Sequence, residues 1–140
     1  MRLNELSWPP MRLLIVRHAE AAPGHPDELR TLTPAGRAQA RALGRRLREE
    51  AFLPDAVVTS PLLRARETAV ALGLGEPQID ERLAPGAAPA DVRDAAIGRG
   101  EIVLVVAHQP DCGHAAAALG GGPEPAFPPC GHALVELSTA

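Results

Sequence analysis

Apolar residues along this chain gather in short runs that end abruptly at charged or small residues. The run at positions 13–16 reads Leu-Leu-Ile-Val, and the run at 102–106 reads Ile-Val-Leu-Val-Val. Unbroken runs of this kind are typical of strands that are covered on both faces in a parallel sheet. Positions 133–137 alternate in part, which favours a strand at a sheet edge. The predicted strands cover residues 12–17, 56–59, a short piece at Ile79, 102–106 and 133–137.

A long amphipathic helix is predicted after the first strand and its loop. Thr33-Pro34 pairs a capping residue with proline at the first helical position. Helical spacing continues to about Glu50. The inward stripe of this helix is predicted to consist of Leu43, Leu47 and the alanines at 35, 38 and 42.

Three further helices are predicted between the remaining strands. Ser60-Pro61 repeats the pairing of a cap with proline, so Ser60 is expected to cap a helix that ends near Gly73. Shorter helices are predicted over 90–97 and 111–119. Strands that alternate with helices indicate an α/β fold, a three-layer α/β/α sandwich with a mixed, mostly parallel sheet.

The length and composition fit one domain at residues 11–140. The chain has 140 residues, of which 46% are hydrophobic and only 2% aromatic, so its core must consist of Leu, Val, Ile and Ala. Met1-Arg2-Leu3 is echoed by Met11-Arg12-Leu13. Residues 1–10 are therefore either an N-terminal extension or a segment before an alternative start at Met11.

Charge and composition exclude several classes of partner. The formal net charge is −3 and aromatic stacking residues are scarce, which argues against nonspecific nucleic-acid binding. No apolar stretch is long enough for a membrane span, and no signal peptide opens the chain. Two cysteines are typical of a reducing compartment, so we expect a cytoplasmic protein. The oligomeric state is left open.

Basic residues and histidines follow the two strongest predicted strands. Arg17 and His18 come directly after the first strand, and His108 follows the strand at 102–106. Ligands of open α/β sheets bind beyond the carboxyl ends of the strands. Arg64 lies one turn into the second helix, close to an N-terminus that attracts anions. We therefore expect Arg17, His18, Arg64 and His108 to surround one phosphoryl group, with a protonated imidazole and two guanidinium groups supplying positive charge.

One histidine of this set can act as a nucleophile through a neutral ring nitrogen. A nearby carboxylic acid could protonate the leaving group. Glu81 is the candidate acid, and Glu20 is the alternative, although Glu20 is expected mainly to support the pocket loop. A separate pattern could supply four zinc ligands, but no metal site is favoured. Its members are Cys112, His114, Cys130 and His132.

Four blocks of sequence together resemble the histidine phosphatase superfamily, which includes the cofactor-dependent phosphoglycerate mutases. They are Arg17-His18-Ala19-Glu20, Leu-Thr-Pro-Ala-Gly at 32–36, Ser-Pro-Leu-Leu-Arg-Ala at 60–65 and Val-Ala-His at 106–108. The resemblance spans residues 12–137. It implies a phosphoglycerate mutase-like fold, His18 as the nucleophile that becomes phosphorylated, and a phosphate pocket of Arg17, Arg64 and His108. It implies no cofactor and no metal.

The spacing of these blocks bears on the branch of the superfamily. Only 43 residues lie between Arg64 and His108, where mutases of this family carry a large cap insertion. The chain is therefore similar to the short phosphohistidine phosphatases of the SixA type. This resemblance implies a phosphorylated protein as substrate, for example a histidine phosphotransfer or phosphocarrier domain. The alternatives are a broad phosphatase for small phosphate monoesters and a noncatalytic phosphate-binding regulatory module.

Overall fold

The two strongest apolar runs lie side by side at the centre of one sheet. The computed structural model describes residues 10–138, and its five strands are ordered β3-β2-β4-β1-β5. β1 pairs in parallel with β4, β2 pairs in parallel with both β4 and β3, and β5 runs antiparallel to β1 at the edge. The strands are β1 (Met11–Arg17), β2 (Ala56–Thr59), β3 (Pro77–Ile79), β4 (Ile102–Ala107) and β5 (His132–Leu137).

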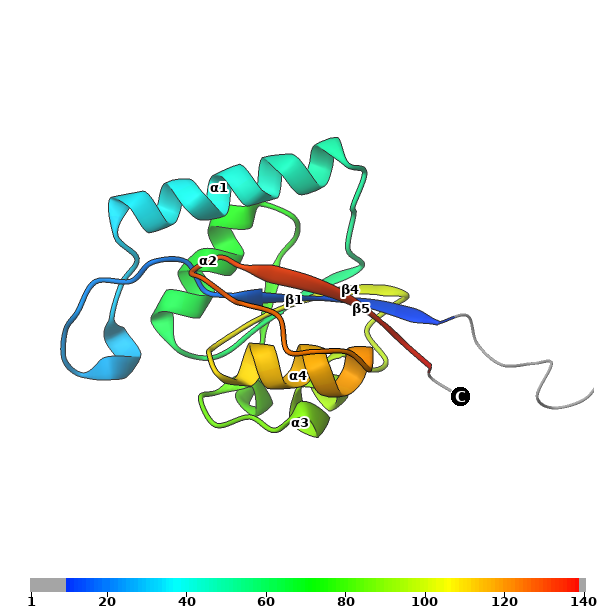
Figure 1. Ribbon diagram of the computed structural model, residues 1–140. Coiled ribbons are helices and arrows are strands. Elements are labelled where there is room, and N and C mark those ends of the chain that lie inside the picture. The colour runs from blue at the N-terminus through cyan, green and yellow to red at the C-terminus, as the bar shows by residue number, and fades with distance from the viewer. Residues whose placement is uncertain (1–9, 139–140) are drawn as a thin grey trace, which may run out of the picture.

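Helices cover both faces of this sheet, which confirms the predicted three-layer sandwich (Figure 1). Two helices lie on one face, above the sheet in the view: α1 (Pro34–Glu49) and α2 (Leu63–Leu72). Two others lie on the opposite face: α3 (Pro89–Ala96) and α4 (Asp111–Gly120). Short 3₁₀ turns follow β1 and β3: η2 (Asp27–Leu29) and η3 (Glu81–Leu83).

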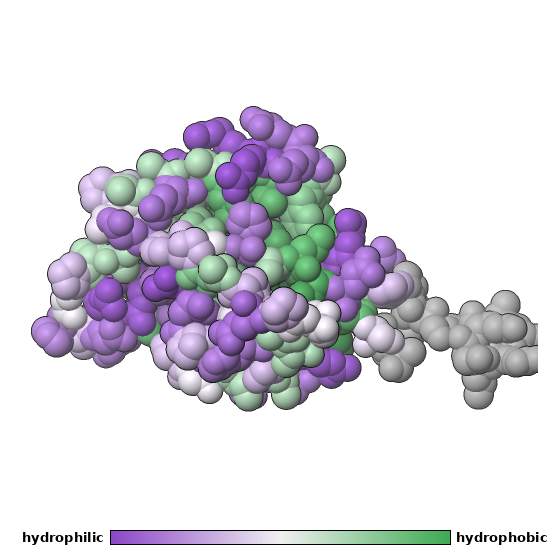
Figure 2. Space-filling view, viewed as in Figure 1, coloured by the Kyte–Doolittle hydropathy of each residue, from purple (hydrophilic) through white to green (hydrophobic). Residues whose placement is uncertain are grey.

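Alternate residues of the central strands belong to two separate cores. Leu14 and Val16 of β1 pack with Leu43 and Leu72 of α1 and α2. Leu13 and Ile15 pack instead among residues of α3, α4 and β5. Because both faces are buried, the strands need apolar residues at every position, which is why they lack alternation. The outer surface of α1 is hydrophilic, as the top of Figure 2 shows.

The inward stripe predicted for α1 is partly wrong. Leu43 and Leu47 are buried as predicted, but the alanines at 35, 38 and 42 are exposed. Gly44 lies against α2, where a Cβ atom would collide with the carbonyl group of Leu72. The two helices approach too closely there for any side chain. A glycine therefore forms the helix contact that the sequence pattern predicted for alanines. The buried residues of α1 are Gly36, Ala40, Leu43, Gly44 and Leu47.

The start of α2 also differs from the prediction. The helix begins at Leu63, and the residue at its N-cap is Leu62, not Ser60. The Ser60 hydroxyl accepts a hydrogen bond from the Leu62 backbone N–H and also contacts His108. Ser60 therefore belongs to the bend between β2 and α2. The left-handed residue Gly73 ends the helix where it was predicted to end.

The segment between Arg64 and His108 consists of the rest of α2, then β3, η3, α3 and β4, so this part of the chain carries no large cap. The prediction of an N-terminal extension or an alternative start concerns residues 1–10, which lie outside the described residues except for Pro10. Within residues 10–138, no helix is both long enough and apolar enough to cross a membrane.

Candidate active site

Two histidines meet at the carboxyl edge of the sheet. Parallel pairing of β1 with β4 places Arg17 opposite Ala107, so the next residues, His18 and His108, leave the sheet side by side. Their ring centroids are 5.3 Å apart, and the ring planes are inclined by 54°. Both residues are buried.

A single hydrogen bond fixes the tautomer of His18. Its Nδ1 lies 2.7 Å from the carbonyl oxygen of Ala19. A carbonyl oxygen can only accept, so Nδ1 must carry the proton and donate it. The neutral ring therefore has its lone pair on Nε2, which is the atom available for attack on a phosphorus centre.

The ring of His108 is held by a hydrogen bond at its Nε2 atom. Its Nε2 lies 2.7 Å from the Ser60 hydroxyl oxygen, while its Nδ1 is buried without a hydrogen-bond partner among the described residues. A buried ring nitrogen without a partner is costly unless a ligand supplies one. The Nδ1 atom of His108 is therefore a candidate contact for a bound anion.

Two arginines complete the positive surroundings of these rings. Arg64 comes from the first turn of α2 and is only 6% exposed, and its Nη1 donates to the backbone oxygen of Asp27 at 3.0 Å. Arg17 donates through Nη1 to the carbonyl oxygen of Phe127 at 3.0 Å. The Nε atoms of both arginines are buried without a partner in the described part of the chain. Each guanidinium thus retains donor capacity for an anion.

Burial makes both histidines weak bases. Desolvation by burial, together with the charges of Arg64 and Arg17, lowers the pKa of His18 to about 4, although its bond to Ala19 acts in the opposite direction. Desolvation, followed by the charges of His18 and Arg64, lowers the pKa of His108 to about 3. Both rings are therefore neutral at pH 7 in the anion-free pocket. The expected protonated second imidazole concerns the pocket with a bound phosphoryl group and stays a prediction.

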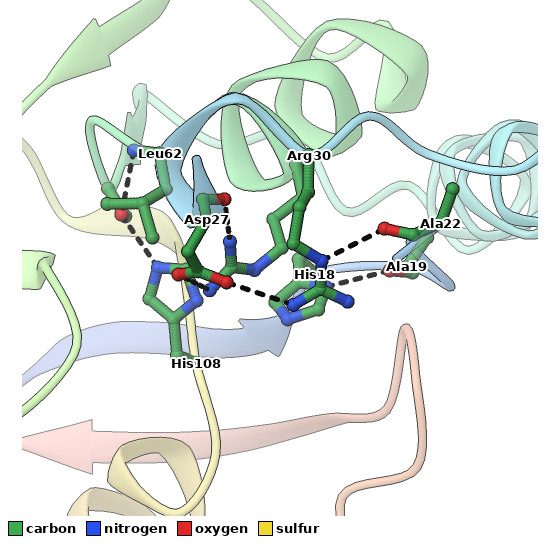
Figure 3. Close-up of polar contacts among 9 residues, drawn as sticks. His18, Ala19, Ala22, Asp27, Arg30, Leu62 and His108 are labelled. Carbon is green, nitrogen blue, oxygen red and sulfur yellow. Dashed lines mark hydrogen bonds and ion pairs between the residues drawn. The ribbon is translucent and has the colours of Figure 1, made fainter. Parts of the chain in front are cut away.

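The loop after β1 adds two charged residues that sequence reasoning missed. Asp27 of η2 contacts Arg64 Nη2 at 3.2 Å through Oδ2, and Arg30 Nη1 at 3.2 Å through Oδ1 (Figure 3). Arg30 is held in turn by its Nε bond to the carbonyl oxygen of Ala22, at 2.9 Å. The hydrogen bond from Arg30 lowers the pKa of Asp27. The i, i+3 spacing of Asp27 and Arg30 in a Pro/Gly-rich loop was the available signal.

A buried threonine ties the loop after His18 to α2. The backbone N–H of Ala19 donates to Thr68 Oγ1 at 3.0 Å, and the Thr68 hydroxyl donates to the carbonyl oxygen of Arg64 at 2.8 Å. The nucleophile candidate and the phosphate-binding candidate are thus linked through one side chain. Sequence reasoning assigned no role to Thr68.

Comparison with known proteins decides the family. Residues 13–85 match the model of the histidine phosphatase superfamily (branch 1). The chain belongs to the histidine phosphatase superfamily. Members of this superfamily include phosphatases, and the structural neighbours support that activity, so the chain is a phosphatase.

Relatives of this histidine phosphatase cover most of its length. An uncharacterized protein of Picosynechococcus is 34% identical over 123 residues, which are 80% of this chain and 74% of the relative. The protein histidine phosphatase SixA in complex with tungstate superposes with a TM-score of 0.77 at 24% identity, over 91% of this chain and 97% of that one. A protein from Nakamurella multipartitia, assigned as phosphohistidine phosphatase SixA, superposes with a TM-score of 0.73 at 30% identity. The match covers 81% of this chain and 68% of that one.

The two acids proposed as proton donors form no hydrogen bond or ion pair with the paired histidines among the described residues. Glu81 begins η3, is exposed, and has no hydrogen bond or ion pair with the pocket residues within the described ranges. Glu20 is exposed and accepts a hydrogen bond from the Thr33 hydroxyl at 2.9 Å, which ties it to the start of α1. The role of Glu81 or Glu20 as an acid stays a prediction.

The zinc-ligand alternative is incompatible with this histidine phosphatase fold. Cys112 packs in the core beneath the sheet, with its thiol directed at the carbonyl oxygen of Val16. Cys130 packs against the core on the opposite face. His114 lies near Glu124, on the exposed side of α4. Among residues 10–138, no group of three or more potential ligands could hold a metal ion.

Proposed function

We propose that this chain hydrolyses phosphohistidine on a protein, through a phosphorylated intermediate on His18. The observation that carries the proposal is the orientation of the His18 ring. Its Nδ1 is committed to the Ala19 carbonyl oxygen, its Nε2 has no hydrogen-bond partner among residues 10–138, and the His108 ring lies 5.3 Å away, centroid to centroid. Arg17, Arg64 and His108 are the phosphate-binding residues of this proposal.

The first step transfers the phosphoryl group to His18. The Nε2 lone pair forms a bond to phosphorus while the P–N bond to the substrate imidazole breaks, and its electron pair stays on the leaving ring nitrogen. The proton on Nδ1 remains hydrogen-bonded to Ala19, so the cationic phosphorylated ring is stabilised where it forms. The Arg17 and Arg64 guanidinium groups offset the charge on the transferred oxygens.

The second step returns the enzyme to its starting state. Water attacks the phosphorus atom on the side opposite Nε2, the P–N bond to His18 breaks, and inorganic phosphate leaves with the proton lost by water. The low pKa of His18, about 4, makes the neutral ring the stable product and supports repeated turnover at pH 7.

The position of the acids favours a P–N bond over a phosphate ester. An ester oxygen leaves poorly unless an acid protonates it. An imidazole that already carries a proton on its second nitrogen leaves as a neutral molecule, so it needs no acid in the enzyme. Asp27 has a lowered pKa and is ionised, and neither Glu81 nor Glu20 forms a hydrogen bond or ion pair with either ring among the described residues. This arrangement supports phosphohistidine as the substrate.

Phosphate labelling tests the intermediate. We expect incubation with a radiolabelled phosphoramidate donor to place acid-labile, alkali-stable phosphate on the chain. The label should be absent from His18→Ala and should disappear from the wild type with the rate of turnover. A wild-type chain that binds phosphate but never becomes labelled would support the noncatalytic regulatory module instead.

A second measurement tests the substrate class. The value of kcat/KM should be higher for a phosphorylated histidine phosphotransfer domain than for p-nitrophenyl phosphate. Equal or faster hydrolysis of the aryl phosphate and of small sugar phosphates would favour the broad phosphomonoesterase. The labelling result would be the same in both cases, so the two experiments separate mechanism from specificity.

A further inference from the structure

A groove of about 660 Å³ runs between the outer face of α2 and the side of α1. On α2 its lining residues are spaced as one helical face, at positions 63, 66, 67, 70 and 71. On α1 the lining residues are Arg37 and Arg41. Neither imidazole of the active site takes part in this groove.

The groove lies on the same helix that supplies Arg64 to the active site. Leu63 lines the groove, and the next residue, Arg64, points to the other side of α2 and contacts Asp27 beside the histidines. From Leu63 to Ala71 the helix rises by about 12 Å, at about 1.5 Å per residue. A molecule whose phosphorylated side chain reached His18 could therefore continue along this face of α2.

The charge of the groove is positive and not internally compensated. Glu67 is its one acidic lining residue, and it is already engaged by the Leu32 backbone N–H at 2.8 Å and by Arg37 at 3.2 Å. Arg41 and Arg66 are exposed, and neither forms an ion pair within residues 10–138. Two guanidinium groups are thus available to carboxylates of a partner.

An apolar ridge accompanies these charges. Val70 is 67% exposed on the outer face of α2. A second hollow, of about 180 Å³, lies on the other side of Val70 and Arg66 and reaches Ile79, which is 53% exposed. Val70 and Arg66 therefore stand between two adjoining hollows, with apolar and cationic atoms side by side.

We propose that this groove docks an acidic, partly apolar face of the phosphorylated protein substrate, with carboxylates on Arg41 and Arg66 and an apolar side chain beside Val70. The proposal rests on the function proposed above and adds the surface that selects the partner. Charge complementarity supports it, because Arg41 and Arg66, which form no ion pair among the described residues, would attract carboxylates. A protein fits better than a nucleic acid or a lipid surface, because a polyanion would not use the apolar ridge and the chain carries a net charge of −3.

Charge reversal in the groove tests the proposal. The variant is Arg41→Glu/Arg66→Glu, and the probe is an acidic histidine phosphotransfer domain phosphorylated in vitro. We expect KM for this domain to rise about tenfold or more with kcat little changed, because docking is lost while the reacting atoms are untouched. Raising the salt concentration from about 0.05 to about 0.3 M should raise the wild-type KM and affect the variant less.

A matched control keeps the total charge the same. Arg45→Glu/Arg46→Glu makes an equal change of net charge at two exposed positions of α1 outside the groove. We expect this variant to keep the wild-type KM within about twofold. Hydrolysis of p-nitrophenyl phosphate, which is too small to reach the groove, should be the same in the wild type and both variants.

Each possible result leads to a different conclusion about the two proposals. Equal KM values for the groove variant and the control variant would overturn the docking site while leaving the phosphatase proposal intact. A wild type that hydrolyses p-nitrophenyl phosphate but not the phosphorylated domain would reject both proposals. Loss of binding to vesicles of anionic phospholipid in the groove variant, with unchanged KM for the domain, would place a lipid surface there and overturn the protein assignment.

Discussion

The two faces of α2 carry arginines in opposite physical settings. Arg64, on the inner face, is 6% exposed and is held by Asp27 beside the paired histidines. Arg66, only two residues later, is exposed on the outer face and lines the groove. The same helix thus supplies one arginine to the buried pocket and another to a solvated surface.

Burial is what separates the two settings. In the pocket, low solvation strengthens every electrostatic interaction, lowers the pKa of both histidines, and leaves guanidinium atoms that lack partners. In the groove, water and salt screen each charge, so an arginine there contributes to encounter and partner choice more than to chemistry. Reactivity and partner selection can therefore be altered independently.

The largest effect is expected at Arg64. Arg64→Ala should lower kcat/KM for p-nitrophenyl phosphate about 1000-fold, on the order of 4 kcal/mol, because a buried charge on the transferred oxygens is lost. Binding of inorganic phosphate should be lost as well, as measured by calorimetry. Arg45→Ala, an exposed substitution on α1, is the control and should stay within about twofold. Wild-type kinetics for a folded Arg64→Ala would mean that the pocket is wrongly assigned.

Among the changes in activity and binding Arg64→Ala has the largest expected effect; histidine titration is a second test, which concerns stability. Ring NMR signals should give pKa values of about 4 for His18 and about 3 for His108, and added inorganic phosphate should raise both. The unfolded chain, with an ordinary histidine pKa of about 6.5, binds these protons first as pH falls. The free energy of unfolding should therefore decrease from about pH 6.5 down to about pH 3, by on the order of 1.4 kcal/mol per unit of pKa shift.

The pH effect has its own control. In His18→Asn/His108→Asn, urea unfolding at pH 7 and pH 4.5 should show a smaller loss of stability than in the wild type. The same loss of stability between pH 7 and pH 4.5 in this variant as in the wild type would contradict a desolvated pocket. So would wild-type pKa values near 6.5 for both rings, and either result would remove the difference between pocket and groove.

Contact between α1 and α2 gives a third test, because the same two helices line the groove. Gly44→Ala should lower the free energy of unfolding by about 2 kcal/mol, since the added methyl group would collide with the Leu72 carbonyl and push the helices apart. Gly122→Ala, where a Cβ atom meets open space, should change stability by less than about 0.5 kcal/mol. Urea denaturation that gave equal values for the two variants would refute this close packing.

The smallest effect is expected at Asp27, whose carboxylate shares Arg64 with any incoming anion. Asp27→Asn should tighten the Kd for inorganic phosphate about three- to tenfold, because a competing negative charge disappears. Glu28→Gln removes the same charge one residue later, where the structure shows no contact with either arginine among the described residues, and should leave Kd unchanged. Weaker phosphate binding in Asp27→Asn would show that this residue supports the anion instead of competing with it.

Much of the active site could be predicted because it follows from local patterns. The apolar runs at β1 and β4 indicate buried parallel strands, and ligand sites lie at the ends of such strands, so Arg17, His18 and His108 could be grouped from the order of residues alone. The position of Arg64 followed from its place just after a helix start. The catalytic roles of these residues and of Glu81 remain predictions for the experiments above.

Other features depended on contacts between distant segments. Ser60 looked like a helix cap, yet its hydroxyl contacts His108, 48 residues away. Asp27 and Arg30 looked like ordinary loop residues, but the loop folds back to Arg64 and brings them to the pocket. The alanines of α1 had the right spacing for burial, but the close approach of α2 required Gly44 instead.

The sequence by itself determined the layers, the strand ends and the residue types that reach them, because hydrophobic spacing and capping act over a few neighbouring positions. Only the tertiary structure decided the protonation of the histidines, the partners of Arg64 and the groove between α1 and α2. These properties depend on which groups exclude water from one another, and desolvation is set by the packing of segments that lie far apart in the chain.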